Sequence, residues 1–141
     1  MSASDTKSNI LFMREACWCC DFSDCKVKTG AVAVSNGTIV ARGHNYLSIE
    51  KLQKEKNERD LAIHAEEKLI KEAAEQHLSL KDCALYLTRF PCESCAKLLT
   101  KAGVKKIYYM SDLFTLGNKA LPFLTKNNIE VVQIKEEEVW K

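Results

Sequence analysis

Two short motifs in this chain carry side chains that could bind a metal ion and move a proton. The first reads HAE at residues 64–66, and the second reads PCESC at residues 91–95. They contribute one imidazole from His64 and two thiols from Cys92 and Cys95. Imidazole nitrogen and thiolate sulfur are ligands that zinc prefers, and a catalytic zinc site keeps its fourth position open for water. The motifs therefore predict a zinc site with three protein ligands.

The same motifs also place a carboxylate beside the predicted metal. Cys92 and Cys95 lie where a helix is expected to begin, so that residues i and i+3 share a face and the positive end of the helix dipole favours thiolates. His64 is expected at the start of a second helix. Glu66 follows it by two residues, close enough to reach a metal-bound water. Zinc lowers the pKa of such a water to about 7, so Glu66 is predicted to accept and deliver protons.

Each motif alone has a simpler interpretation. A single Cys-x-x-Cys can be redox-active or form half of a zinc ribbon, and His-Ala-Glu often lies on a helix surface. A closed structural zinc site would need a fourth ligand, for which Cys83 and His44 are the candidates. Cys83 is expected to begin a strand, away from the helix start. A catalytic site is therefore favoured over a structural one.

The element before the motifs is predicted to be a helix over residues 8–24. Its apolar side chains recur near the helical period, and they are Leu11, Phe12, Ala16, Cys19 and Cys20. The cysteine-rich run at residues 17–20 is interpreted as packing in or near the core. A second metal site there lacks a nearby histidine.

A hairpin is predicted next. Asn36-Gly37 lies between β-rich runs at residues 29–35 and 38–43, and this dipeptide is typical of a tight hairpin turn. Residues 50–60 alternate in charge and are predicted to form a solvated helix or loop.

From residue 64 onward, helical and strand patterns alternate. Helices are predicted over residues 64–77, 91–102 and 116–127, strands over 83–88, 104–110 and 129–134, and a polar tail over 136–141. Pro91 is expected in the first turn of its helix, Gly103 to end that helix, and Pro122 to disturb the next one. Strands separated by helices pair in parallel. The prediction is an α/β fold with three α/β/α layers, in which a mixed five-stranded sheet carries helices on both faces.

Composition limits the class of protein. A chain of 141 residues, 46% hydrophobic and 28% charged, indicates one globular domain over residues 1–141. The net charge of +2 gives no support for nucleic acid as a partner. No apolar run approaches the roughly 20 residues of a membrane span, so no membrane partner is expected. Because the first residues are polar and the seven cysteines show no disulfide pattern, a cytoplasmic location is expected.

With these motifs in place, the chain resembles the cytidine deaminase superfamily, specifically its deoxycytidylate deaminase branch. The resemblance extends over nearly the whole chain. It is carried by residues 12–32, by Gly43-His44-Asn45, by FPCESCAK at residues 90–97 and by residues 103–109.

The resemblance implies a hydrolytic deamination in which water attacks C4 of cytosine, ammonia leaves and uracil forms. It implies that His64, Cys92 and Cys95 hold Zn²⁺ and that Glu66 shuttles protons. The expected substrate is a small-molecule nucleotide or nucleoside similar to dCMP. The family also implies a homo-oligomer, a dimer or larger.

Four further residues acquire expected roles from the resemblance. Asn45 is expected to hydrogen-bond the sugar or the base. The backbone of Ala65 and the turn at Phe90-Pro91 are expected to line the base pocket.

Two departures from the family pattern lie near the nucleotide or the subunit interface. Residues 46–48 replace a glycine-containing loop, and Lys68 stands where the family often has asparagine. Lys28, Arg42 and Arg89 could each contact a 5′-phosphate, although such a residue is more often a solvated surface charge.

Two other functions share these motifs. A transfer-RNA adenosine deaminase has the same His-Ala-Glu and Pro-Cys-x-x-Cys, but it is disfavoured because no long basic, aromatic helix follows the last predicted strand. A deaminase of another free base or nucleoside also remains open. A non-catalytic zinc-stabilised binding module is disfavoured by the presence of Glu66.

Overall fold

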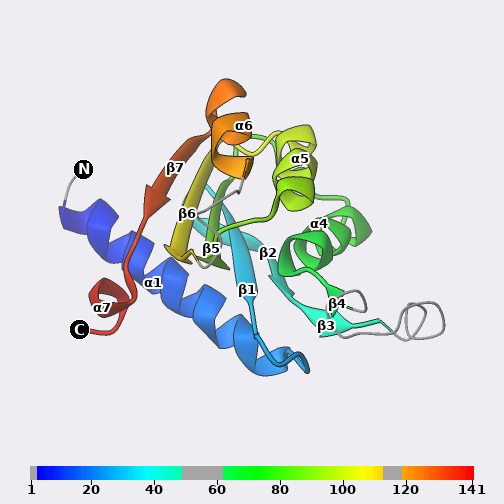
Figure 1. The fold of residues 1–141 in the computed structure, drawn as a ribbon. Helices are drawn as coiled ribbons and strands as arrows, with labels where there is room; N and C mark the ends of the chain where they lie inside the picture. The colour runs from blue at the N-terminus through cyan, green and yellow to red at the C-terminus, as the bar shows by residue number, and fades with distance from the viewer. Residues whose placement is uncertain (1–2, 49–61, 113–118) are drawn as a thin grey trace.

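The computed structural model describes residues 3–48, 62–112 and 119–141 (Figure 1). The helices are α1 (Ala3–Cys19), the 3₁₀ turn η1 (Cys20–Phe22), α4 (Ala65–Glu75), α5 (Glu93–Ala102), α6 (Ala120–Lys126) and α7 (Glu136–Val139). The strands are β1 (Gly30–Ser35), β2 (Thr38–His44), β3 (Tyr46–Leu47), β4 (Ala62–Ile63), β5 (Ala84–Arg89), β6 (Lys106–Ser111) and β7 (Glu130–Gln133).

Five of these strands form one sheet in the order β2-β1-β5-β6-β7. The hairpin partners β1 and β2 are antiparallel, and so are β1 and β5. The strands β5, β6 and β7, which alternate with helices along the chain, are parallel. The predicted mixed five-stranded sheet is confirmed.

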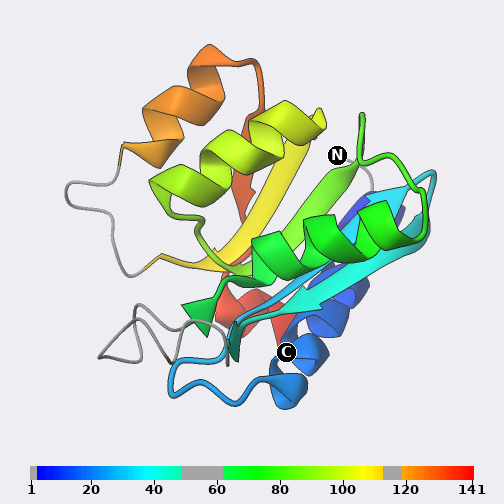
Figure 2. The same cartoon turned by 90° about the vertical axis from the view of Figure 1, so that its right-hand side faces the viewer.

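Helices cover both faces of this sheet (Figures 1 and 2). Successive side chains of a strand point to opposite faces, and β5 shows this clearly. Leu85 and Leu87 join the core beneath α4, α5 and α6, whereas Tyr86 joins the core beneath α1. The predicted α/β class with helices on both faces is therefore confirmed, and α4 and α5 lie on the same face.

The first helix differs from its prediction. It begins at Ala3 rather than near residue 8 and gives way to η1 after Cys19. Its buried side includes Met13, Ala16 and Cys19, whereas Leu11 is 49% exposed. The sequence pattern placed Leu11 on the buried side of the helix, which is wrong. Leu11 and Phe12 are adjacent apolar residues, and the pattern alone does not show which of them faces the sheet.

The C-terminal residues also differ from their prediction. Residues 136–141 do not form a plain polar tail, because α7 occupies part of them. Val139 is fully buried against the α1 side of the sheet, and Arg14 Nε donates a hydrogen bond to its carbonyl oxygen at 2.8 Å. The prediction of a polar tail followed from the glutamates that precede Val139. It was wrong because the burial of Val139 alone anchors this one helical turn.

The predicted positions of the two prolines relative to their helices were only approximately right. Pro91 lies outside α5, just before its N-cap residue, rather than in its first turn. Pro122 lies in the first turn of α6, where backbone N–H groups need no helical partner, so the helix tolerates it. The short β3–β4 pair was not predicted, and the prediction for residues 50–60 lies outside the described residues.

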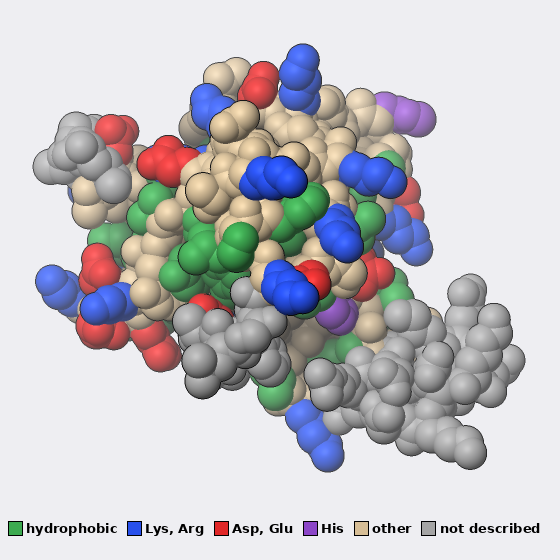
Figure 3. Space-filling view, turned by 45° about the horizontal axis from the view of Figure 1, so that its top comes forward, with side chains coloured by type: hydrophobic (Ala, Val, Ile, Leu, Met, Phe, Trp, Pro, Cys, Tyr) green, Lys and Arg blue, Asp and Glu red, His purple; other side chains and the backbone are tan. Residues whose placement is uncertain are grey.

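The surface carries charges of both signs. On the face in Figure 3, lysine and arginine side chains are spread among acidic and uncharged ones rather than gathered into one tract. Within the described ranges, no helix is long and apolar enough to cross a bilayer.

Candidate metal centre

The two motifs occupy the N-termini of two neighbouring helices. His64 is the N-cap residue of α4, directly after β4, and Cys92 is the N-cap residue of α5, just after β5. Cys95 is three residues further along in α5. Because both helices pack on the same face of the sheet, their first turns meet.

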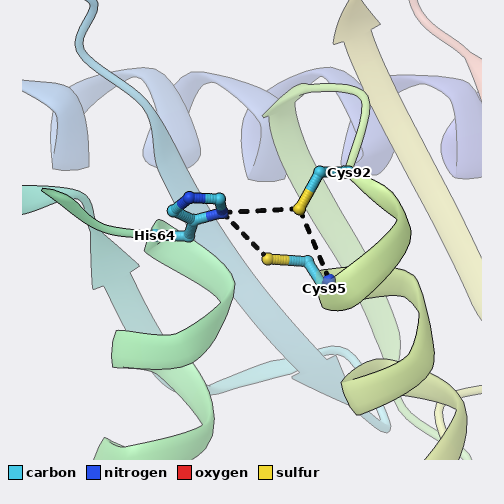
Figure 4. Close-up of side chains that lie close together, drawn as sticks. All are labelled: His64, Cys92 and Cys95. Atoms are coloured by element: carbon cyan, nitrogen blue, oxygen red, sulfur yellow. Dashed lines mark hydrogen bonds between the residues drawn. The ribbon is translucent and has the colours of Figure 1, made fainter. Parts of the chain in front are cut away.

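The three side chains converge on one point (Figure 4). His64 Nδ1 lies 3.2 Å from Cys95 Sγ and 3.5 Å from Cys92 Sγ. Zinc–sulfur bonds near 2.3 Å and zinc–nitrogen bonds near 2.0 Å, at tetrahedral angles, place N and S ligand atoms about 3.5 Å apart. The donor set and its spacing therefore fit a zinc ion.

Among the described residues, three side chains and no fourth protein ligand make up this group. In the described parts of the chain, His64, Cys92 and Cys95 are the group of metal-binding side chains that lies close enough to share an ion. His44 instead lies against the rings of Phe22 and Tyr46, at centroid distances of 5.9 and 6.0 Å. Neither His44 nor Cys83 joins the group, which is the arrangement of an open site.

The thiols are prepared for metal binding. A hydrogen bond from the Cys95 thiol is the main cause that lowers the pKa of Cys92 to about 3. The same hydrogen bond, together with burial, raises the pKa of Cys95. The lowered pKa of Cys92 favours the thiolate form that a metal binds, and metal binding at Cys95 would release its proton.

Glu66 lies in the first turn of α4, two residues beyond His64. It is only 8% exposed, and burial raises the pKa of its carboxyl above the ordinary value. A hydrogen bond with the Cys95 side chain acts in the opposite direction. The carboxyl group is thus held beside the metal group, in a position and environment that suit proton transfer.

The start of α4 is held by a residue that the sequence analysis did not single out. The backbone N–H of His64 donates to Glu67 Oε1 at 3.2 Å. A Glu three residues after an N-cap residue is a known capping signal, so this contact could have been predicted.

Asn45 is buried and engaged with the protein itself. Its Oδ1 accepts hydrogen bonds from Ser23 Oγ at 2.6 Å and Thr29 N at 2.9 Å, and its Nδ2 donates to the Val27 carbonyl at 2.8 Å. The side chain thereby ties residues 23–29 to the end of β2. The predicted contact with a sugar or base stays a prediction.

The other predicted pocket residues are also largely buried. Ala65 is 1% exposed and Phe90 is 7% exposed, and Pro91 is fully buried. The Phe90 ring packs edge-on against Tyr109, with 4.9 Å between centroids. Their contact with a base stays a prediction.

Two of the three candidate phosphate-binding residues come together. Lys28 and Arg89 line one cavity of about 280 Å³, whose other polar residues include Thr88, Ser111 and Glu136. The charge of Glu66 raises the pKa of Arg89, although burial has the larger and opposite effect. Arg89 therefore lines the cavity and is also near enough to Glu66 for the charge of that carboxyl to act on it. Arg42, in contrast, forms an ion pair with Glu15, with 3.8 Å between Arg42 Nη2 and Glu15 Oε2.

Three side chains that could hold a metal ion, with a buried carboxyl beside them, have the arrangement of a catalytic metal centre. The chain belongs to the cytidine and deoxycytidylate deaminase family, since residues 6–111 match the model described as "Cytidine and deoxycytidylate deaminase zinc-binding region". The prediction of zinc as the cofactor is confirmed at the level of this family.

Relatives of two kinds are similar to the chain. A probable deoxycytidylate deaminase of Caenorhabditis elegans is 31% identical over 107 residues, which cover 69% of this chain and 53% of the relative. A tRNA-specific adenosine deaminase of Aquifex aeolicus is 33% identical over 90 residues, which cover 62% of this chain and 54% of the relative. The chain thus spans about half the length of these curated relatives.

Solved structures share the fold over nearly the whole chain. The dCMP deaminase of cyanophage S-TIM5, in complex with dCMP and dUMP, has a TM-score of 0.77 and 26% identity, covering 95% of this chain and 99% of that one. A Thermotoga maritima deaminase/reductase of 21% identity shows the same fold, with a TM-score of 0.76 over 96% of this chain and 39% of that one.

Proposed function

We propose that this protein is a zinc-dependent hydrolase that removes the 4-amino group of a cytosine nucleotide, with dCMP as the model substrate. The observation that carries the proposal is the open His64–Cys92–Cys95 group with the buried Glu66 beside it. The similarity to deoxycytidylate deaminases supports the choice of base and sugar. The products are ammonia and the corresponding uracil nucleotide.

The chain's own residues account for the proton transfers. His64, Cys92 and Cys95 would hold the zinc ion, which supplies a Lewis acid that makes water a nucleophile at neutral pH. Glu66 takes a proton from the attacking water, donates one to the ring nitrogen N3, and returns one to the departing amino group. Water supplies the oxygen of the new carbonyl, and the amino group leaves as ammonia.

The proposal is tested by ammonia release from the zinc-loaded protein. The substrates are dCMP, deoxycytidine, CMP, cytidine, adenosine and a transfer-RNA anticodon stem-loop. We expect dCMP to be the best substrate, and Glu66→Gln to retain zinc but lose turnover by about 10²- to 10⁴-fold. Undiminished turnover by Glu66→Gln would refute the role of the carboxyl.

We further propose that Lys28 and Arg89 contact the 5′-phosphate, because they line one cavity and the charge of Glu66 acts on Arg89. Lys28→Ala is expected to lower kcat/KM for dCMP about tenfold and to leave deoxycytidine unaffected. Arg42→Ala is the matched control, since Arg42 faces Glu15 instead. An equal loss for both substrates would contradict phosphate recognition by Lys28.

A second candidate is adenosine deamination in transfer RNA, favoured by the similarity to the Aquifex aeolicus enzyme. Turnover of the stem-loop with little turnover of dCMP would establish it in place of the first. The expected homo-oligomer also stays a prediction, to be checked by light scattering of the purified protein.

A further inference from the structure

The sulfur of Cys92 has two hydrogen-bonding neighbours from its own helix. Cys95 N donates to Cys92 Sγ at 3.5 Å, and Ser94 Oγ lies 3.2 Å from the same sulfur. A metal-bound thiolate carries no proton and only accepts hydrogen bonds. The Ser94 hydroxyl must therefore be the donor when a metal is present.

The two sulfur ligands differ in how firmly the protein holds them. Cys95 is 1% exposed, on the packed side of α5. Cys92 is only half-buried, so packing restrains its side chain less. A side chain without packed neighbours keeps several rotamers, and fixing it for metal binding then costs conformational entropy. A directed hydrogen bond can take the place of the missing packing.

We propose that Ser94 is a positioning residue for the metal centre, whose hydroxyl fixes Cys92 Sγ in the direction of the shared metal position. The proposal rests on Cys92 being a zinc ligand. Hydrogen-bond partners of metal ligands typically contribute 10- to 100-fold to metal affinity. Because Ser94 is exposed and water can partly replace its hydroxyl, we expect an effect at the lower end of that range.

The test is zinc affinity, measured by competition with a chromogenic chelator. Ser94→Ala is expected to bind zinc about tenfold more weakly than the unchanged protein, and Ser94→Thr, which keeps the hydroxyl, to bind within about twofold of it. Ser79→Ala is the matched control, because Ser79 Oγ accepts from Lys81 N and does not contact the metal group. Unchanged zinc affinity in Ser94→Ala would overturn the proposal.

Cobalt substitution provides a readout that a general loss of stability would not move. The thiolate-to-cobalt absorption band should shift in Ser94→Ala at full cobalt occupancy and return in Ser94→Thr. A band identical to that of the unchanged protein would count against the hydrogen bond.

Cys92→Ala separates this proposal from the one on which it rests. If Cys92→Ala binds zinc normally, the ligand assignment is wrong. If Cys92→Ala loses zinc while Ser94→Ala does not, the assignment stands and only the role of Ser94 fails.

Discussion

The two helices that carry the metal centre begin in different ways. At α4, the cap is provided by Glu67, which accepts the His64 N–H and does not belong to the metal group. At α5, the side chain that accepts the Cys95 N–H is Cys92, which is itself a candidate ligand. Capping and metal binding are separate tasks at α4 but share one sulfur atom at α5. A substitution at α4 should therefore change mainly helix capping or mainly zinc binding, whereas substitution of Cys92 at α5 should change both.

The largest effect on zinc affinity is expected from Cys92→Ala. Losing a ligand should weaken zinc binding by more than about 100-fold, beyond the loss of a hydrogen-bonded neighbour. The metal-free protein should also lose about 0.5–1 kcal/mol of unfolding free energy, because the cap of α5 disappears. Chelator competition and urea unfolding of the metal-free protein measure the two losses.

His64→Ala is the comparison for this variant. It should lose zinc to a similar degree, yet destabilise the metal-free protein less, because the hydrogen bond from the His64 backbone N–H to Glu67 Oε1 remains in this variant. If the two variants lost equal unfolding free energy in the metal-free state, capping and metal binding would not be divided differently at α4 and α5.

Glu67→Ala should have an intermediate effect. It removes the acceptor of the His64 N–H but no ligand, so the metal-free protein should lose about 1 kcal/mol while zinc affinity falls only a few-fold. Glu67→Gln, which can still accept this hydrogen bond, should restore most of both. The control is Glu75→Ala, an exposed position at the far end of α4. A loss of zinc as severe as in Cys92→Ala would mean that capping and ligation are not separate at α4.

Gly103→Ala should have the smallest effect on zinc. Gly103 ends α5 with a φ of 85°, which an alanine adopts only with strain, so a loss of about 1 kcal/mol in stability is expected. The ligands lie at the other end of the helix, and zinc affinity should stay unchanged in the chelator assay. Weaker zinc binding in the folded variant would show that both ends of α5 are coupled.

Local spacing explains what the sequence could predict. Cys92 and Cys95 are separated by about one helical turn, and Glu66 follows the N-cap residue His64 by two positions, so the residues of the candidate site followed from short motifs. The parallel pairing of β5, β6 and β7 followed from their alternation with helices.

Long-range register explains what the sequence could not predict. The hydrogen bonds of Asn45 to Ser23 and Thr29 exist only because the end of β2 lies beside the segment that leads into β1. Likewise, Val139 anchors the C-terminal segment through contacts with the core on the α1 side of the sheet, which only the folded structure shows. Neither contact has a signal in a short stretch of sequence.

One contact between β2 and α4 bears on the dimensions of the candidate metal centre. Gly43 lies so close to α4 that a methyl group at this position would be 2.8 Å from Leu69 N and would collide with the carbonyl oxygen of Ala65. A side chain there would force β2 and α4 apart, and a displacement of α4 would move His64 and Glu66 relative to Cys92 and Cys95. A strand that contributes none of the three candidate ligands thus limits, through the missing Cβ of Gly43, how closely α4 can approach the sheet.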